Sequence, residues 1–567
     1  MNALRPSIGW LVTLTSFCVA LSAHAQGPDR DEPVLDALNA ELQRAMSELG
    51  SAQYPAPYYV AYAVKDEKLQ RIVAKQGALI LNDSDHARNA HVDVRVGDYS
   101  FDNSEDVDAE WADEPDFIPL HSLPLNDSAK ALRHAMWLLT DLRYKKAAAS
   151  YLRLKGKRLF EAQPTRTRIS HAKGKALERL EPLHETPHDN ARWQAMVSEL
   201  SAQAATPDYV FDSEVEFRAG RTYRWFINSE GTRIRTLRPY IQIHVLARTR
   251  ADDGMLLEHS VDHYATMEAD LPSNEALRKA TTRMLSELEA LKNAPELGPY
   301  TGPALLAPRA AGVFFHEVLG HRLEAHRQDS DHEGQTFADH LDKPVLPAFL
   351  SVHDNPTKTH VGVTPLNGAY TYDDEGIKAQ DTALVERGIL KSFLMGRRPA
   401  PGFDISNGHG RAAGVQRPTA RMGNLIVHAH KNITDQSLFK LLLKEIRRQG
   451  KPYGLWIRDL TGGQTNTSSS GYQAFKGEAR MVYKVDAKSG TKTLVRGVDL
   501  VGTPLATLSK ILAAGQSIGV FNGYCGAESG MIPVSTVAPA LVFSEVELQR
   551  TARARGKKPL LDAPALP

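Results

Sequence analysis

The chain has 567 residues, of which 42% are hydrophobic and 24% charged, the composition of an ordinary globular protein. Lys and Arg (68) nearly balance Asp and Glu (67), so the formal net charge is +1. This balance gives no reason to expect nucleic acid or an anionic membrane surface as a partner. The length predicts more than one domain, because single domains commonly hold about 100–200 residues.

Residues 1–25 have the character of a secretory signal peptide. A basic start that includes Arg5 precedes an apolar run from Ile8 to Leu21, and small residues lead up to Ala25, where cleavage is expected. The run is short for a membrane span and a polar stretch follows it, although a retained N-terminal anchor is the alternative interpretation. We therefore expect a periplasmic or secreted protein without a stable membrane anchor.

The pattern of helical and strand-like segments in residues 26–300 predicts an N-terminal α/β domain. Apolar residues at helical spacing from Val34 to Leu49 indicate its first helix, and residues 274–294 indicate its last. A helical block at about residues 120–200 is interpreted as an insertion. Strand-like segments occupy residues 58–64, 76–82, 91–101, 208–220, 221–228, 232–238 and 240–251.

Residues 295–310 are rich in Pro and Gly and indicate a domain boundary. The C-terminal domain that follows, residues 301–548, has frequent glycines and short strand-like segments, with few helices, at about 314–327 and 436–449. The tail 549–567 is expected to be disordered. The overall prediction is an α+β protein of two domains, in which a strand-rich C-terminal domain carries the first of these helices.

The sequence HEVLGH, residues 316–321, is one residue longer than the H-E-x-x-H motif of zinc peptidases. Histidines four positions apart differ by roughly 40° around a regular helix, but His316 and His321, five apart, would differ by roughly 140°. One π-type turn absorbs an extra residue, and Gly320 tolerates an irregular backbone. The segment therefore predicts a metal site on a deformed helix, with ordinary helix histidines as the alternative.

A third ligand must come from elsewhere, because catalytic zinc sites commonly use three protein ligands. Glu324 and His326 are near in sequence, and either could bind the metal or orient a ligand histidine. Cys525 is the distant candidate, since a thiolate is a good zinc ligand. The only other cysteine, Cys18, would leave with the signal peptide. Metal binding would protect the remaining thiol from oxidation, whereas a small buried hydrophobic residue is the alternative interpretation.

Several separated motifs add to this pattern, in the order HEVLGHRLE, YDDEGIKAQDTALVERGILKSFLMGRR, SNGHGRA, YGLWIRDLTGGQ and CGAESGMIPVS. Between about residues 300 and 545 they resemble the TldD/PmbA family of metallopeptidases in register. The resemblance implies a Zn²⁺ site formed by His316, His321 and Cys525, with Glu317 as general base. The first half of the chain resembles the α/β domain of the family only loosely.

Other residues carry weaker predictions. The polar stretch 461–479, which includes Gly462 and Gly463, is predicted to line the cleft, with a surface loop as the alternative. His409 and Arg411 are predicted to contact substrate carbonyls or to stabilise an oxyanion, with a structural turn as the alternative.

The resemblance implies a zinc-dependent peptidase that acts on peptides or unfolded proteins. The predicted signal peptide implies export, in which this chain departs from the best-known, cytoplasmic members of the family. Low sequence specificity is expected, because an extended substrate would be held mainly by backbone hydrogen bonds along a sheet edge. Family members work as dimers, commonly of a metal-bearing and a metal-free subunit, so a homodimer or a heterodimer is expected. The alternatives are a non-catalytic subunit of such a complex and a metal-dependent amidase that acts on cell-wall peptides.

Overall fold

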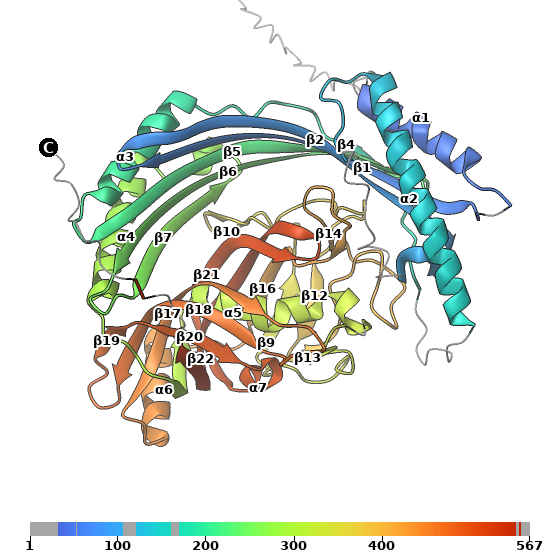
Figure 1. The fold of residues 1–567 in the computed structure, drawn as a ribbon. Helices are drawn as coiled ribbons and strands as arrows, with labels where there is room; N and C mark the ends of the chain where they lie inside the picture. Colours follow the sequence, from blue (N-terminus) through green and yellow to red (C-terminus); the bar gives the residue numbers. More distant parts are fainter. Residues whose placement is uncertain are drawn as a thin grey trace, which may run out of the picture.

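The computed structural model describes residues 32–52, 54–105, 121–159, 169–330, 332–551 and 555–556. The predicted signal peptide, residues 1–25, and most of the predicted tail lie outside these residues. None of the helices in the described ranges is long and apolar enough to cross a membrane. Two sheets dominate the molecule, and one of them arches over the other (Figure 1).

The N-terminal sheet has seven strands in the order β3-β2-β1-β5-β6-β4, with β7 paired to β6. All neighbours are antiparallel except β4 and β6. The prediction of an α/β domain is therefore corrected to an antiparallel sheet: hairpins join β1 to β2, β5 to β6 and β6 to β7, and the segment between β2 and β5 carries helices α2 (Ala129–Arg158) and α3 (Asn190–Ala205). The strands are β1 Pro57–Lys75, β2 Ala78–Asp98, β3 Phe101–Asp102, β4 Glu178–Leu180, β5 Val210–Asn228, β6 Arg233–Arg250 and β7 Leu256–Ala265.

The long strands of this sheet exceed the segments that the sequence predicted. β1 has 19 residues and β2 has 21, where short apolar runs indicated only separate strands of about half this length. The polar residues between those runs belong to the same strands, because they continue the antiparallel pairing of β1 with β2 and with β5. Figure 1 shows the result, a curved sheet whose concave side faces the C-terminal half.

Helices cover the convex side of the arch at its two ends (Figure 1). Helices α1 and α2 pack together over one apolar cluster of the sheet, and α3 and α4 over another. The predicted helical block at about 120–200 thus separates into α2 and α3, which lie at opposite ends of the sheet. Their bounds are α1 Pro33–Glu48, α2 Ala129–Arg158, α3 Asn190–Ala205 and α4 Asn274–Asn293, with 3-10 turns at Asn103–Glu105 and Glu268–Asp270.

The C-terminal sheet has eleven strands in the order β13-β12-β9-β16-β22-β20-β18-β17-β8, with β19 paired to β18 and β21 paired to β22. It confirms a strand-rich C-terminal half. The strands are β8 Tyr300–Leu306, β9 Leu350–Asp354, β12 Thr382–Glu386, β13 Ile389–Leu390, β16 Asn424–Ala429, β17 Tyr453–Thr465, β18 Phe475–Asp486, β19 Lys492–Val495, β20 Val498–Gly502, β21 Ile511–Ala527 and β22 Gly530–Arg550.

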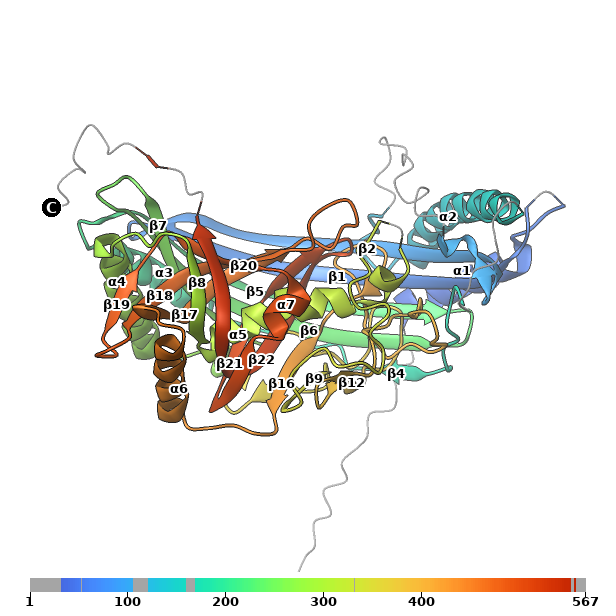
Figure 2. The ribbon, with the colours of Figure 1, turned by 90° about the horizontal axis from the view of Figure 1, so that it is seen from below.

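The remaining elements of this half are short. Helix α5 runs along the sheet near its centre, and α6 projects from one end (Figure 2). Residues 549 and 550, predicted to be part of a disordered tail, belong to β22, where they pair with β20. The elements are β10 His360–Val361, β11 Thr364–Pro365, β14 Gly410–Arg411, β15 Thr419–Ala420, α5 Pro308–Phe315, α6 Asp435–Arg448 and α7 Pro504–Leu508.

Ion pairs join the concave face of the arch to the C-terminal half. Asp374 lies 3.1 Å from Lys65 Nζ on β1 and 3.2 Å from Arg224 Nη1 on β5. Lys65 also donates to the Ala412 carbonyl at 2.8 Å. Elsewhere, Arg397 Nη2 bonds Glu230 Oε1 at 2.7 Å. These contacts hold the arch against the loops between β11 and β16.

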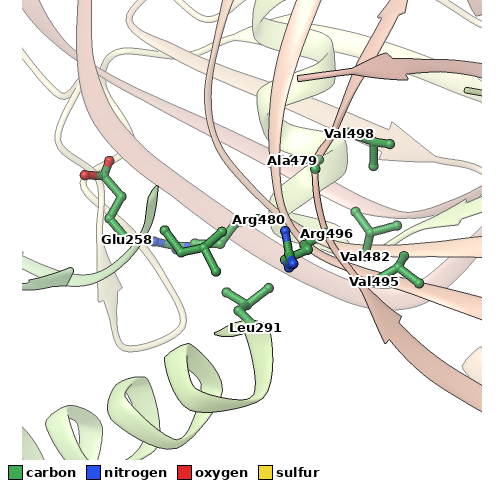
Figure 3. A pocket seen from close by; sticks show the side chains of 10 residues that line it. Glu258, Leu291, Ala479, Arg480, Val482, Val495, Arg496 and Val498 are labelled. Atoms are coloured by element: carbon green, nitrogen blue, oxygen red, sulfur yellow. The ribbon is translucent and has the colours of Figure 1, made fainter. Parts of the chain in front are cut away.

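Figure 3 shows a pocket at a second seam, where α4 and β7 meet the C-terminal sheet. Leu291 of α4, Glu258 of β7 and Val482 of β18 are among the residues that line it. Its volume of about 10 Å³ leaves room for about one water molecule. This seam is therefore close-packed and offers no space for a substrate.

Candidate metal centre

The extra residue of the HEVLGH motif is absorbed by a π-helical turn, as its spacing predicts. Helix α5 continues into a π turn at His316–Gly320, and a 3-10 turn at His321–Leu323 follows. The backbone N–H of His321 donates to the carbonyl of His316, five residues earlier. Gly320 fits closely here, because a Cβ at this position would lie 2.0 Å from Sδ of the buried Met422, which would have to move. The deformed helix thus directs both histidines to one side.

The three side chains His316, His321 and Cys525 meet in the interior of the C-terminal half. Cys525 Sγ, on β21, is 3.3 Å from His316 Nε2 and 3.2 Å from His321 Nε2. The two imidazole rings are nearly perpendicular, with centroids 5.0 Å apart. All three residues are buried, and their candidate ligand atoms lie within 4.8 Å of one another. Among the described residues, no other group of His, Cys, Asp and Glu has this geometry.

The cluster fits a zinc ion. Imidazole and thiolate ligands at their usual zinc distances of about 2.1 and 2.3 Å lie about 3.6 Å apart when the coordination is tetrahedral. The observed N–S distances of 3.3 and 3.2 Å are close to this value. Glu324 Oε1 lies 3.3 Å from Nδ1 of His321, which leaves Nε2 of that ring directed at the sulfur. The donor set therefore suits zinc in both chemistry and spacing.

The electrostatics of the cluster favour a thiolate. Burial by itself would raise the pKa of Cys525, but the adjacent His321 and His316 hold it well below its usual range. Burial would likewise lower the pKa of His321, but Cys525 and Glu324 raise it to about 10. Since the thiolate is the form of cysteine that binds metals, these neighbours prepare Cys525 for that role.

Glu317 lies on the same π turn, against the glycine-rich end of β17. A Cβ on Gly463 would lie 2.4 Å from Glu317 Cγ, whereas a Cβ on Gly462 would meet nothing within 4 Å. Burial raises the pKa of the Glu317 carboxyl above its usual value. The predicted base is thus in a dry position beside the ligand cluster, and Gly463 makes room for it.

The remaining predicted residues have other contacts. His326 is 3.8 Å from Glu528 and is not part of the cluster. His409 is fully buried, with Nδ1 2.9 Å from Asn407 Oδ1 and Nε2 3.3 Å from Asp354 Oδ1. Arg411 donates to the Met422 carbonyl and lies over the ring of Tyr370. These contacts correspond to the structural alternative for His409 and Arg411.

Three arginines that the sequence analysis did not single out surround the site. Arg322 donates to the Glu317 carbonyl at 2.8 Å and to the Asn466 carbonyl at 3.0 Å, so it joins the π turn to the end of β17. Arg327 and Arg421 both contact Glu324. No pattern in the sequence indicates that these arginines are buried, because charged side chains are normally exposed.

Comparisons with known proteins match mainly the half of the chain that carries this cluster. Residues 299–550 match the PmbA/TldA metallopeptidase C-terminal domain. "Metalloprotease MJ0996" of Methanocaldococcus jannaschii is 32% identical over 235 residues, which cover 41% of this chain and 47% of the relative. "Zinc metalloprotease TldD homolog" of Saccharolobus solfataricus is 26% identical over 277 residues, or 48% of this chain and 56% of the relative. The chain thus spans about half the length of the curated relatives it matches.

The fold has counterparts among solved structures. A Thermotoga maritima protein of known structure superimposes with a TM-score of 0.59 at 15% identity, covering 86% of this chain and 96% of that protein. At this identity the likeness shows the fold alone, a mixed α+β architecture with two sheets. The C-terminal half of the chain therefore contains both the match to the PmbA/TldA metallopeptidase C-terminal domain and the His-His-Cys cluster.

Proposed function

We propose that the protein is a zinc-dependent peptidase that hydrolyses peptides or unfolded proteins with low sequence specificity. The observation that carries this proposal is the convergence of His316, His321 and Cys525 from elements more than two hundred residues apart in sequence. The names of the curated relatives support it. A non-catalytic role is disfavoured, because a metal scaffold alone has no need for Glu317 in its dry position beside the cluster.

Zinc held by His316, His321 and Cys525 would supply Lewis-acid activation of a water molecule and of the scissile carbonyl. Glu317 carries the proton: its carboxylate takes one from the attacking water and returns it to the leaving amine. The raised pKa of Glu317 suits this role, because the group must hold the proton between the two transfers. Its burial excludes bulk water that would compete for the proton.

The end of β17 is the sheet edge best placed to hold an extended substrate. Pairing between β17 and β8 stops at Ile457, so beyond this residue β17 pairs only with β18 among the described strands. Arg309 Nη1 donates to the Leu460 carbonyl at 2.7 Å, and Arg322 donates to the Asn466 carbonyl. The residues between these two positions, 461–465, leave an edge beside Glu317 to which a peptide backbone can add.

The edge of β21 is less suitable, although this strand carries Cys525. The Gly523 carbonyl accepts from Asn367 Nδ2 at 3.0 Å, and the Cys525 carbonyl accepts from Arg421 Nη2 at 2.7 Å. Side chains therefore already occupy the positions that a substrate backbone would need. We propose that the substrate lies along β17, and that β21 serves to position the metal ligand Cys525.

Metal content and hydrolysis together test the proposed function. The purified protein is expected to hold about one zinc per chain and to degrade an unfolded protein such as reduced casein. Cys525→Ser is expected to lose both properties, because it removes one of three ligands. Wild-type protein that holds no zinc, or zinc-loaded protein without hydrolytic activity, would contradict the proposal.

We further propose that the protein is exported and acts as a dimer, as its N-terminal sequence and the family resemblance suggest. A mature N-terminus near Gln26, determined by mass spectrometry of the protein secreted by its host, would support export. Light scattering of the purified protein would establish whether it forms a dimer by itself. A stable monomer would instead favour a requirement for a related subunit.

A further inference from the structure

Glu324 and Arg421 form a buried ion pair beside the His-His-Cys cluster. Both side chains are fully shielded from solvent, and Arg421 Nε is 3.5 Å from Glu324 Oε1. The same carboxylate oxygen lies 3.3 Å from Nδ1 of His321. The ion pair is thus connected directly to one of the predicted ligands.

The other end of Arg421 holds the turn that carries Cys525. Its Nη2 donates to the Cys525 carbonyl at 2.7 Å, and its Nη1 donates to Ser529 Oγ at 2.9 Å and to the Gly530 carbonyl at 3.2 Å. These acceptors lie on both sides of the connection between β21 and β22. One guanidinium group therefore fixes the whole turn, from the ligand residue to the start of the next strand.

Arg327 provides a second connection between the same two segments. Its Nε donates to Glu324 Oε2 at 2.8 Å, and its Nη2 lies 2.8 Å from Glu528 Oε1 in the β21–β22 turn. Both oxygens of Glu324 thus face an arginine, and each arginine reaches the turn. The segment after His321 and the segment after Cys525 are held together at two points.

The turn needs such support. The end of the hairpin near the turn lies beyond the other strands of the sheet, because β16 pairs with β22 only from Ser535 onward, and from Gly530 to Val534 β22 pairs only with β21 among the described strands. Tyr524 and Met531, which flank the turn, are 40% and 59% exposed, so the hydrophobic core holds the turn only through its inward-facing residues. A sulfur ligand delivered by a hairpin must be fixed to within a fraction of an ångström to complete a metal site.

We propose that Arg421 is a positioning residue for the metal centre: with Glu324 it clamps the Cys525 turn to the His321 turn and so sets the place of the sulfur relative to the imidazoles. The inference rests on the proposed function, because it concerns the same metal site. Residues that orient ligands in this way commonly contribute about 10–100-fold to metal affinity.

Arg397 offers a matched control. Like Arg421 it is fully buried and paired with a carboxylate, Glu230, and it also donates to a backbone carbonyl, that of Ala172, at 2.8 Å. Its contacts join the arch to the C-terminal half and none of them reaches the ligand cluster. Replacing Arg397 therefore measures the cost of removing a buried arginine without disturbing the site.

The experiment compares Arg421→Met, Arg421→Lys, Arg397→Met and Cys525→Ser with the wild type, using Co²⁺ as a spectroscopic substitute for zinc. We expect Arg421→Met to bind Co²⁺ at least about tenfold more weakly and to lose the thiolate-to-cobalt charge-transfer band, as Cys525→Ser does. Arg421→Lys, which keeps the charge but cannot reach all three acceptors, is expected to be intermediate. Arg397→Met is expected to retain the band and the affinity.

Hydrogen exchange of the metal-free proteins separates this proposal from the proposed function. Exchange at residues 523–530 is expected to accelerate in both Arg421 variants and not in Arg397→Met. If the wild type binds no metal but this acceleration is found, the proposed function fails and the clamp stands. If Arg421→Met keeps the band, the affinity and the exchange rate, the clamp is wrong. Should the methionine variant not fold, the same unchanged readouts in Arg421→Lys would overturn it.

Discussion

The two sheets of this protein each contain a strand of 21 residues, β2 in one and β22 in the other, but they use charged side chains differently. In the N-terminal arch, ion pairs join neighbouring strands and range from partly exposed ones such as Arg71–Glu216, with 41% of the arginine side chain accessible, to buried ones such as Arg88–Asp66, and neither of these pairs contacts the ligand cluster. In the C-terminal half, Glu324 and Arg421 are fully buried beside the ligand cluster. Exposed pairs contribute little to stability, whereas buried networks are costly unless fully satisfied.

The difference indicates that the arch mainly supports the stability of the fold, whereas the C-terminal half also supports the chemistry of the ligand cluster. The arch is stabilised by long hairpins and by helices that pack on its two large apolar clusters. The C-terminal half, in addition, places a buried ion pair beside the ligand cluster, where Arg421 also donates hydrogen bonds to the β21–β22 turn. We expect changes in the arch to affect stability first, and changes near the cluster to affect activity first.

The largest expected effect is on catalysis, from Glu317→Gln. The amide cannot accept and return a proton, so hydrolysis of an unfolded protein is expected to fall about 10²–10⁴-fold. Zinc content, measured on the same sample, should not change, because Glu317 is not among the three predicted ligands. Activity equal to that of the wild type would exclude the proposed role of Glu317.

The next largest effect tests the arch. Trp193 on α3 is fully buried and stacks on Phe217 of β5, with ring centroids 4.3 Å apart. Trp193→Ala is expected to lower the free energy of unfolding by about 3–5 kcal/mol. Denaturant unfolding measures this loss, and zinc content per folded molecule should remain that of the wild type. Loss of zinc from folded Trp193→Ala protein would contradict the expectation that a change in the arch lowers stability without affecting the metal site.

Gly463→Ala and Gly462→Ala form a matched pair near the cluster. The added methyl group at 463 would meet Glu317 Cγ at 2.4 Å, whereas at 462 it would enter open space. Displacing the base by about 1 Å is expected to reduce kcat/KM about a hundredfold in the first variant. The second variant changes the same proposed substrate edge without meeting Glu317, so a much larger loss in Gly463→Ala would assign the effect to the contact with Glu317, and equal losses in both would show that this contact is not the cause.

The smallest expected effect lies at the junction of the two halves. Lys65 and Arg224 outweigh the effect of burial and hold the pKa of Asp374 well below its usual value of 3.8. A lowered pKa in the folded state stabilises the fold fully above about pH 4, and this contribution is lost as the pH falls. Asp374→Asn is expected to cost about 1–3 kcal/mol at neutral pH and less in acid. Equal losses at pH 7 and pH 3, measured by urea unfolding, would contradict this assignment.

Several features of the fold could be predicted from local patterns. The four long helices, apart from the interpretation of the block at 120–200, follow from apolar spacing, and the strands of the arch from runs of β-branched and aromatic residues. The lengths of β1 and β2 could not be predicted, because their central residues are polar on both faces. Whether such a segment continues a strand depends on its neighbours, here β5 along most of β1.

The sequence by itself predicted the deformation at residues 316–321, because two histidines five apart can bind one metal only if the helix widens. The structure shows that Gly320 has ordinary helical backbone angles and is needed for its lack of a Cβ beside Met422. The sequence also determined which residue types were available as ligands, since Cys525 is the only cysteine outside the predicted signal peptide. Only the tertiary structure decided that the sulfur meets the imidazoles and that buried arginines hold it there. The physical reason is that burial can be inferred locally for apolar side chains, whereas a buried charge is stable only if partners from distant segments surround it.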